Sequence, residues 1–392
     1  MPGPPELSAR AVALKPSLTL AIAAQAKALK NAGRDICSLS AGEPDFDTPD
    51  FIVEATRKAL RDGITRYGPA AGEPELRAAV AEKLSSTNGI ATTSEQILIT
   101  NGGKQAIYNL FQVLLNPGDQ VLLPAPYWLS YPEMAALAGA EVKLIPTQAE
   151  GGFQLDINAL EAAITPRTRL LVLNTPGNPT GRVMPRQELE AVAEMVRRHP
   201  QLLVMSDEIY EFLLAQGEQH HSFAAIAPDL ADRCFTVNGF AKGWAMTGWR
   251  LGYLTGHQNV IKAAAALQSQ STSNVCSFAQ RGALAAIQGP RDCVDAMAES
   301  YNRRRLLLTE GLQAIEGITL VEPRGAFYAF PKLPESAGGS MDFCRYALEQ
   351  AGLAVVPGLA FGDDRCIRLS CAVSRETIRD GLSRLGQLLS TT

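Results

Sequence analysis

The stretch Phe240-Ala241-Lys242-Gly243-Trp244-Ala245-Met246-Thr247-Gly248-Trp249-Arg250 follows an apolar run, residues 233–238, that predicts a strand. An amine at the end of a buried strand loses hydration, which disfavours its charged form. Lys242 can therefore act as a nucleophile toward an aldehyde. Arg250 offers a forked cation that suits a phosphate. Together the two residues suit a cofactor that carries both groups, as pyridoxal phosphate does.

The composition is that of an ordinary globular protein. The 392 residues are 19 % charged and 46 % apolar, and their length favours one large domain plus a smaller one. A net charge of −4 gives no basic field for nucleic acid or an anionic membrane, and we expect no membrane span and no signal peptide. Seven scattered cysteines and four histidines without ligand spacing predict a cytoplasmic protein with no metal site. We expect His220-His221 to lie in a solvated loop.

Short apolar runs alternate with amphipathic stretches through the middle of the chain. The runs expected to form buried strands are residues 97–100, 121–123, 142–145, 170–173, 202–205 and 235–237. Alternation of this kind predicts an α/β fold with a mostly parallel sheet that helices cover on both faces. We place this large domain at residues 50–290.

The last hundred residues have a different pattern. A long helix is expected to begin near Arg291, and residues 325–330 and 367–370 are expected to form strands. Ser374 can cap a final helix. We expect a small α+β domain at residues 291–392, with residues 1–49 packing on it as an N-terminal segment.

Asn101-Gly102-Gly103-Lys104 lies between a predicted strand and a predicted helix. Two glycines let the backbone approach an anion, and the helix N-terminus supplies free N–H groups. Taken alone, the pair of glycines is more typical of a plain turn. The phosphate interpretation depends on Arg250 lying nearby.

Asp207 is expected at the carboxyl end of a parallel strand, where open α/β sheets bind ligands. A carboxylate there can keep a pyridine nitrogen protonated, which makes the ring an electron sink. Tyr210 could donate its phenol to the ring oxygen of the same cofactor. The alternative for Asp207 is a helix cap.

Three further residues have two interpretations each. Asn178, between prolines in Asn174–Gly181, could serve a ring oxygen and a substrate carboxylate, or could belong to a rigid loop with a cis peptide before Pro179. Trp128 could stack on a pyridine ring or lie in the core. Arg368, in an apolar strand, could bind a substrate α-carboxylate or form a structural salt bridge.

The motifs resemble, in order, those of the class I aminotransferases among the fold-type I pyridoxal phosphate enzymes, and of their bacterial aspartate aminotransferase subgroup. They are Ser40-Ala41-Gly42-Glu43-Pro44-Asp45-Phe46, Tyr67-Gly68-Pro69, Asn178-Pro179-Thr180-Gly181, Ser206-Asp207-Glu208-Ile209-Tyr210, Lys242 with Thr247-Gly248-Trp249-Arg250, and Ile367-Arg368-Leu369-Ser370. The resemblance covers nearly the whole chain. It implies a seven-stranded sheet in the large domain and transfer of an amino group to a 2-oxo acid.

The resemblance also implies roles for the residues. Lys242 would bind the cofactor's aldehyde and shuttle a proton, and Asp207 would pair with the ring nitrogen. The other expected cofactor contacts are Tyr210, Asn178, Trp128, Gly102, Gly103, Lys104 and Arg250. The expected substrate contacts are Arg368, Asn178, Trp128, Lys104 and the Gly42 backbone. Tyr67 would reach the phosphate of the neighbouring subunit, which implies a homodimer with shared sites.

One position departs from the pattern. Many relatives carry a phosphate-binding serine three residues before the lysine, whereas this chain has Gly239. We expect weaker retention of the cofactor and unchanged chemistry.

The expected substrate is an acidic amino acid, aspartate or glutamate, because Lys104 would face its distal carboxylate. A solvated helix-start lysine is the alternative for Lys104. Lys15 could fold over the site and suit prephenate as a bulky dicarboxylate. An aromatic or kynurenine aminotransferase and a pyridoxal phosphate β-lyase remain alternatives, while a nicotinamide dehydrogenase is disfavoured because no GxGxxG follows the early strands.

Overall fold

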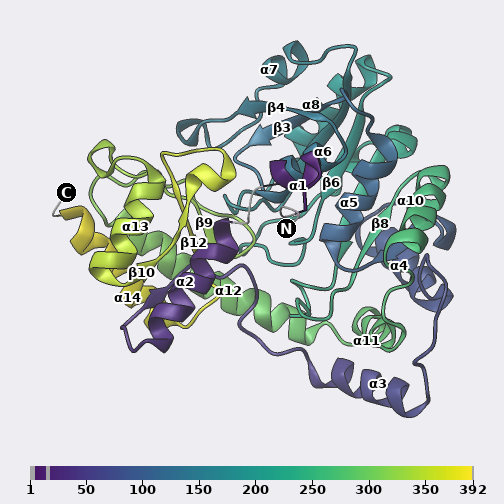
Figure 1. Ribbon diagram of the computed structural model, residues 1–392, viewed down its shortest axis with the longest axis horizontal. Helices are drawn as coiled ribbons and strands as arrows, with labels where there is room; N and C mark the ends of the chain where they lie inside the picture. Colours follow the sequence, from purple (N-terminus) through teal and green to yellow (C-terminus); the bar gives the residue numbers. More distant parts are fainter. Residues whose placement is uncertain (1–4, 15–17, 391–392) are drawn as a thin grey trace.

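A seven-stranded sheet forms the core of the larger part of the protein. Its labelled strands β3, β4, β6 and β8 lie in the upper right of Figure 1. The computed structural model describes residues 5–14 and 18–390. The strands lie in the order β2-β8-β7-β6-β5-β3-β4, and six of them coincide with the apolar runs of the sequence. Five of these six are buried as expected, but the prediction of a buried strand is wrong for β4, which lies at the edge of the sheet and is mostly exposed. Their bounds are β2 (Ile97–Thr100), β3 (Gln120–Ala125), β4 (Glu141–Pro146), β5 (Thr168–Asn174), β6 (Leu203–Asp207), β7 (Cys234–Gly239) and β8 (Gly252–Thr255).

Strand β8 was not predicted from the sequence. It has four residues, begins with a glycine, and pairs antiparallel with both β2 and β7, whereas β3 to β7 run parallel. In that register Gly239 lies opposite Gly252. The segment between them, which holds the lysine and arginine, must therefore turn back at the carboxyl end of β7.

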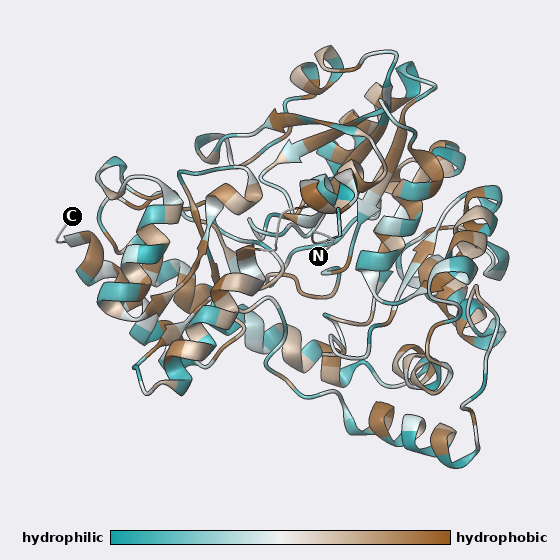
Figure 2. Ribbon diagram, in the orientation of Figure 1, coloured by the Kyte–Doolittle hydropathy of each residue, from teal (hydrophilic) through white to brown (hydrophobic). Residues whose placement is uncertain are grey.

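Helices cover both faces of this sheet, as expected. Alternate residues of a strand point to opposite faces. Ile97 and Ile99 accordingly belong to one buried core, and Leu98 to the other. Each such side chain contributes about 1.5–3 kcal/mol when fully buried. Figure 2 shows hydrophobic strands between helices that are hydrophobic on one side.

The two cores divide the helices between the faces. One core includes residues of α3 (Asp50–Arg61), α4 (Pro74–Thr87), α8 (Arg186–Arg198), α9 (Phe223–Ile226) and α11 (Ser277–Gln288). The other includes residues of α5 (Gly103–Leu114), α6 (Ser130–Leu137) and α10 (Gln258–Ser271). The short α7 (Ile157–Ala162) packs against α8. Single turns of 3₁₀-helix are at Ser94–Gln96, Ala149–Gly151, Pro228–Arg233, Glu335–Ala337 and Gly358–Phe361.

The C-terminal part has its own sheets, on the left of Figure 1. The long helix α12 (Asp292–Gln313) leads to an antiparallel sheet in the order β11 (Val356–Pro357), β12 (Ile367–Ser370) and β9 (Tyr328–Ala329). Helices α13 (Ser340–Ala351) and α14 (Arg375–Ser390) pack beside it, and the expected cap of Ser374 on Thr377 N is present at 3.1 Å. The strand expected at 325–330 is shorter, because Ala326 has a φ of 52° that breaks the extended backbone.

The N-terminal segment contacts this C-terminal part. It contains α1 (Ala9–Ala13), α2 (Leu18–Asn31) and β1 (Cys37–Ser38), which pairs in parallel with β10 (Leu353–Ala354). Ala26 of α2 packs against Leu348 and Ala354. The division into domains after residues 49 and 290 stays a prediction. Over the described ranges, no helix has the length and apolar character needed to cross a membrane.

Candidate active site

A cleft of about 890 Å³ opens at the carboxyl ends of the parallel strands, between the large sheet, the C-terminal elements and α2. Most of the residues that the sequence singled out line it, although they come from distant segments. These are Gly42, Gly102, Gly103, Lys104, Trp128, Asn178, Asp207, Tyr210, Lys242, Arg250 and Arg368. Tyr67 is not among them and is 92 % exposed. Lys15 lies outside the described residues.

Lys242 lies just beyond the end of β7, with its amine inside the cleft. Its Nζ donates a hydrogen bond of 2.6 Å to the carbonyl of Gly42. Burial and then the positive charge of Arg368 lower the pKa of Lys242 to about 8. An amine with that pKa is partly neutral near pH 7 to 8, which a nucleophile or a proton acceptor requires.

Asp207 ends β6 and is 5 % exposed. Its Oδ2 accepts a hydrogen bond of 2.7 Å from the Tyr131 hydroxyl, and its Oδ1 accepts one of 3.3 Å from Ile209 N. Burial raises the pKa of Asp207 to about 6, although both hydrogen bonds act against it. A turn follows Asp207 in place of a helix, so the helix-cap alternative is wrong.

The start of α5 forms one end of the cleft. Gly102 has a φ of 80°, and a Cβ there would lie 2.7 Å from Arg250 Nη2. Arg250 adopts a φ of 55°, and its guanidinium donates to Thr247 O at 2.9 Å and to Asn101 O at 3.3 Å. The sequence-predicted pairing of the double glycine with Arg250 is therefore present. The site can bind an anion through backbone N–H groups and a cation.

Gly239 lies where β7 and β8 come closest. A Cβ at this position would be 2.8 Å from Gly252 Cα and 2.9 Å from Leu251 O. Both of those atoms belong to the backbone and cannot move aside as a side chain would. The backbone at this position therefore leaves no room for a serine.

Arg368, on β12, is 3 % exposed and points into the cleft. It donates to Asn178 Oδ1 at 3.0 Å and to Ser40 O at 3.2 Å, while its Nε has no partner. The guanidinium lies 4.4 Å from the ring centroid of Tyr328. Within the described part of the chain it pairs with no carboxylate, so the salt-bridge alternative is wrong. A buried cation without an anion suits an anionic ligand.

The remaining predicted residues lie around the cleft. The backbone N–H of Asn178 donates to Asn174 Oδ1 at 2.8 Å, and the peptide bond before Pro179 is cis, as expected. Trp128 is partly buried, and the Lys104 amine lies 5.1 Å from its ring centroid. Burial and the charge of Arg250 lower the pKa of Lys104.

Sequence reasoning missed two tyrosines of the cleft. Tyr328 is 1 % exposed, and its hydroxyl lies 3.0 Å from the hydroxyl of Tyr210. Tyr131 bonds Asp207, as described above. Each lies in a stretch that reads as ordinary core, and the partner is 118 residues away for Tyr328 and 76 for Tyr131. The one sequence feature that could have drawn attention to Tyr131 is its position three residues after Trp128, which the sequence analysis did single out.

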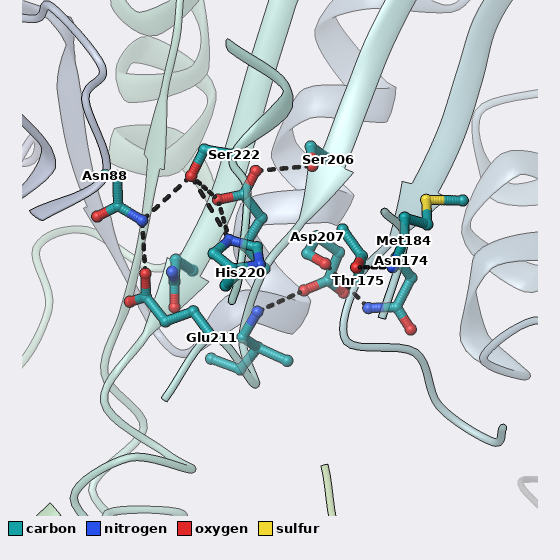
Figure 3. Close-up of polar contacts among 12 residues, drawn as sticks. Asn88, Asn174, Thr175, Met184, Ser206, Asp207, Glu211, His220 and Ser222 are labelled. Atoms are coloured by element: carbon teal, nitrogen blue, oxygen red, sulfur yellow. Dashed lines mark hydrogen bonds and ion pairs between the residues drawn. The ribbon is translucent and has the colours of Figure 1, made fainter. Parts of the chain in front are cut away.

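A buried polar network lies beside Asp207 (Figure 3). Glu208 accepts hydrogen bonds from Ser206 at 2.8 Å and Ser222 at 2.6 Å, and lies 3.1 Å from His220 Nε2. His220 and His221 lie in a loop as expected, but the side chain of His220 is only 8 % exposed, so the prediction that it is solvated is wrong. Burial lowers the pKa of His220, but the hydrogen bond and charge of Glu208 outweigh that effect and raise it overall.

The network continues to Glu211, which pairs with Lys83 and accepts a hydrogen bond of 2.6 Å from Asn88. Asn88 also donates to Ser222 at 3.1 Å, which joins the two halves. With His220 protonated, the network holds two carboxylates and two cations. It ties α4 to the turn that follows Asp207.

The fold and the cleft together define the class of protein: a fold-type I transferase, with a mostly parallel seven-stranded sheet and a lysine and a buried aspartate at its carboxyl edge. The family model "Aminotransferase class I and II" matches residues 34–385. The chain therefore belongs to the class I and II aminotransferases.

Individual relatives are similar over almost the full chain. It is 48 % identical to an aspartate/prephenate aminotransferase of Thermus thermophilus, over 98 % of each chain. It is 48 % identical to a bifunctional aspartate aminotransferase and glutamate/aspartate-prephenate aminotransferase of Petunia hybrida, over 98 % of this chain and 83 % of the relative. A solved aspartate aminotransferase from T. thermophilus with maleate has a TM-score of 0.94 at 46 % identity, covering 98 % of this chain and 100 % of that one.

Proposed function

We propose that the chain is a pyridoxal phosphate-dependent aminotransferase that moves the amino group of aspartate or glutamate to a 2-oxo acid such as 2-oxoglutarate or oxaloacetate. One observation carries the proposal. A single cleft holds an amine that is partly neutral, a buried carboxylate and a buried guanidinium without an anion, from Lys242, Asp207 and Arg368. The names of the relatives favour an acidic substrate.

The residues present fit the cofactor. Lys242 supplies the amine for its aldehyde, and Asp207 supplies a carboxylate for its ring nitrogen. Gly102 and Gly103 supply backbone N–H groups for its phosphate, and Arg250 supplies a cation. A Cβ on residue 102 would lie 2.7 Å from Arg250 Nη2, so only glycine leaves this space open. When bound, pyridoxal phosphate supplies an electron sink for the bond that breaks at the substrate α-carbon.

Other residues would hold the ring and the substrate. Trp128 offers a ring face, and Tyr210 and Asn178 offer donors to the ring oxygen. Arg368 offers two parallel N–H groups to an α-carboxylate, with Asn178 beside it at 3.0 Å.

Lys242 would also move the proton. Its pKa of about 8 lets the neutral amine accept the proton of the substrate α-carbon and return it during the same half of a ping-pong cycle. The oxygen of Gly42, 2.6 Å from Nζ, orients the amine meanwhile. Arg368 fixes the substrate so that its α-hydrogen faces that amine.

Lys104 would set the preference for acidic substrates. Its amine lies 5.1 Å from the centroid of the Trp128 ring, in the lining of the cleft, and could pair with a distal carboxylate.

A panel of amino donors and 2-oxo acids, with purified protein loaded with pyridoxal phosphate, tests the proposal. We expect turnover with aspartate and 2-oxoglutarate, and a change in the visible absorption of the cofactor when aspartate alone is added. Lys242→Ala should abolish both, whereas Lys262→Ala, an exposed lysine of α10, should change neither. Turnover without a keto acid would indicate a β-lyase, and no response to aspartate would rule out the acidic substrate.

Prephenate is a second candidate acceptor, because similar proteins are named for both aspartate and prephenate. We infer that Lys15 would contribute to it. Lys15→Ala should then lower kcat/KM for prephenate more than for oxaloacetate, and equal losses would exclude a special role. Lys262→Ala, at an exposed position of α10 outside the cleft lining, is the matched control.

We further propose a cytoplasmic homodimer in which Tyr67 reaches the partner's site. The side chain of Tyr67 is 92 % exposed, which is in keeping with a place in an interface. The seven cysteines are all free thiols, which is in keeping with a reducing compartment. Light scattering should give twice the chain mass of 42.0 kDa. A mixture of Tyr67→Ala and Lys242→Ala subunits should recover activity, since one site of each hybrid is intact.

A further inference from the structure

Tyr131 makes the single side-chain hydrogen bond to the Asp207 carboxylate among the residues that the structure describes. It lies near the start of α6, is 2 % exposed, and donates to Oδ2 at 2.7 Å. The other oxygen, Oδ1, has only the backbone of Ile209 at 3.3 Å. The orientation and charge of this carboxylate therefore depend largely on one phenol.

The same tyrosine also contacts Trp128. The two rings lie edge to face, with centroids 5.3 Å apart and planes at 83°. Tyr131 N donates to Trp128 O at 3.0 Å, so the backbone fixes the pair as well. Trp128 and Asp207 are the residues that we expect at the face and the nitrogen of the cofactor ring. One side chain touches both.

We propose that Tyr131 is a positioning residue that keeps Asp207 ionised and aimed at the cofactor ring nitrogen, so that this nitrogen stays protonated. The inference rests on the proposed function. A hydrogen bond donated to a carboxylate stabilises its charged form, and in a buried site no water replaces a lost donor. Burial is the largest influence against ionisation of Asp207, and the negative charge of Glu208 adds to it. Lys242 acts in the opposite sense.

Tyr131→Phe tests this directly, because it keeps the ring and its contact with Trp128 and removes only the hydroxyl. The variant and the wild type are loaded with pyridoxal phosphate labelled with ¹⁵N in the ring, and the nitrogen chemical shift is recorded. If the pKa of Asp207 rises by about 1, its ionised-to-neutral ratio falls about tenfold. We therefore expect the nitrogen resonance of Tyr131→Phe to move toward that of unprotonated pyridine.

A second readout is the dissociation constant of the cofactor, which should rise about tenfold in Tyr131→Phe for the same change in ionisation. Tyr127→Phe is the matched control, since Tyr127 is a half-buried tyrosine four residues away with no bond to Asp207. It should leave the nitrogen resonance and the dissociation constant unchanged. Equal values for Tyr131→Phe and wild type would overturn the inference.

The outcomes distinguish failure of the proposed function from failure of the role of Tyr131. If the wild type does not bind pyridoxal phosphate, the proposed function fails. If it binds and Tyr131→Phe matches it, only the role of Tyr131 fails. Should Tyr131→Phe not fold, 3-fluorotyrosine at position 131 takes its place. Its more acidic phenol donates more strongly and should tighten cofactor binding, and an unchanged or weaker affinity would reject the proposal.

Discussion

Arg368 Nη1 donates a hydrogen bond of 3.0 Å to Asn178 Oδ1, which joins β12 to the loop after β5 across 190 residues of sequence. Nη2 of the same guanidinium donates to Ser40 O at 3.2 Å, while Nε has no partner among the described residues. A charge that is buried without a counter-ion costs free energy in the empty protein. A substrate carboxylate would remove that cost on binding.

Arg368→Lys should weaken substrate binding while it keeps the charge. Lysine cannot form two parallel hydrogen bonds to a carboxylate, and a bond to a charged group contributes about 1.5–3 kcal/mol. We expect kcat/KM for aspartate to fall roughly 10- to 100-fold. Arg365→Lys is the control, since Arg365 pairs with Asp363 outside the cleft lining. Similar steady-state constants for both variants would count against the assignment.

Lys104→Met should change substrate preference more than overall activity. The substitution removes the amine above Trp128 and keeps a side chain of similar length. A lost pair with a distal carboxylate would lower kcat/KM for aspartate about tenfold, and the value for alanine far less. Lys143→Met, on an exposed position of β4, is the control. An equal loss for aspartate and alanine would indicate that Lys104 does not contact the substrate's distal carboxylate.

Gly239→Ser should destabilise the protein without improving its hold on the cofactor. The added Cβ would lie 2.8 Å from Gly252 Cα, so β7 and β8 must separate, at a cost of about 1–3 kcal/mol. Urea unfolding measures this loss, and a cofactor titration measures affinity. Gly248→Ser, where a Cβ meets nothing within 4 Å, should be neutral for stability. A Gly239→Ser protein of wild-type stability would show that the strands move apart freely.

The network around His220 should make stability depend on pH. Glu208 faces His220 at 3.1 Å, with Glu211 and Lys83 nearby, and the pKa of His220 in the folded protein is raised above 6.5. Its contribution to the free energy of unfolding is therefore complete below pH 6.5 and is lost as pH rises through the higher folded pKa.

Urea midpoints of the wild type, measured from about pH 5.5 to pH 9, would show this loss. The range begins below the ordinary pKa of histidine and extends above it. His220→Gln should flatten it. His221→Gln is the control, because burial lowers the pKa of His221. The stability of His221→Gln should fall with rising pH as that of the wild type does. If His220→Gln and the wild type lose stability in parallel, another group titrates.

Much of the sheet could be predicted because its strands are regular and buried. The runs at β2, β3, β5, β6 and β7 are largely apolar and buried on both faces, whereas β4 at the edge of the sheet is mostly exposed. An apolar run is visible in the sequence without knowledge of any neighbour. Strand β8 gave no such signal, since four residues beginning with glycine resemble a loop until β2 and β7 pair with them on either side. The burial of His220 could not be predicted either, because its neighbours in the sequence are polar. In the folded protein, Glu208 and Ser222 lie against each other and against His220 in a buried network.

The sequence by itself determined the kinds of reactive group and their order: an amine after one strand, a carboxylate after another, and an arginine in an apolar run near the end. Side-chain chemistry and backbone periodicity are local properties, so the chain states them directly. Only the tertiary structure decided that Arg368 has no carboxylate partner among residues 5–14 and 18–390, that Tyr131 bonds Asp207, and that β7 approaches β8 too closely for a side chain at 239. These facts concern distances between segments far apart in sequence, which packing sets and no local pattern records.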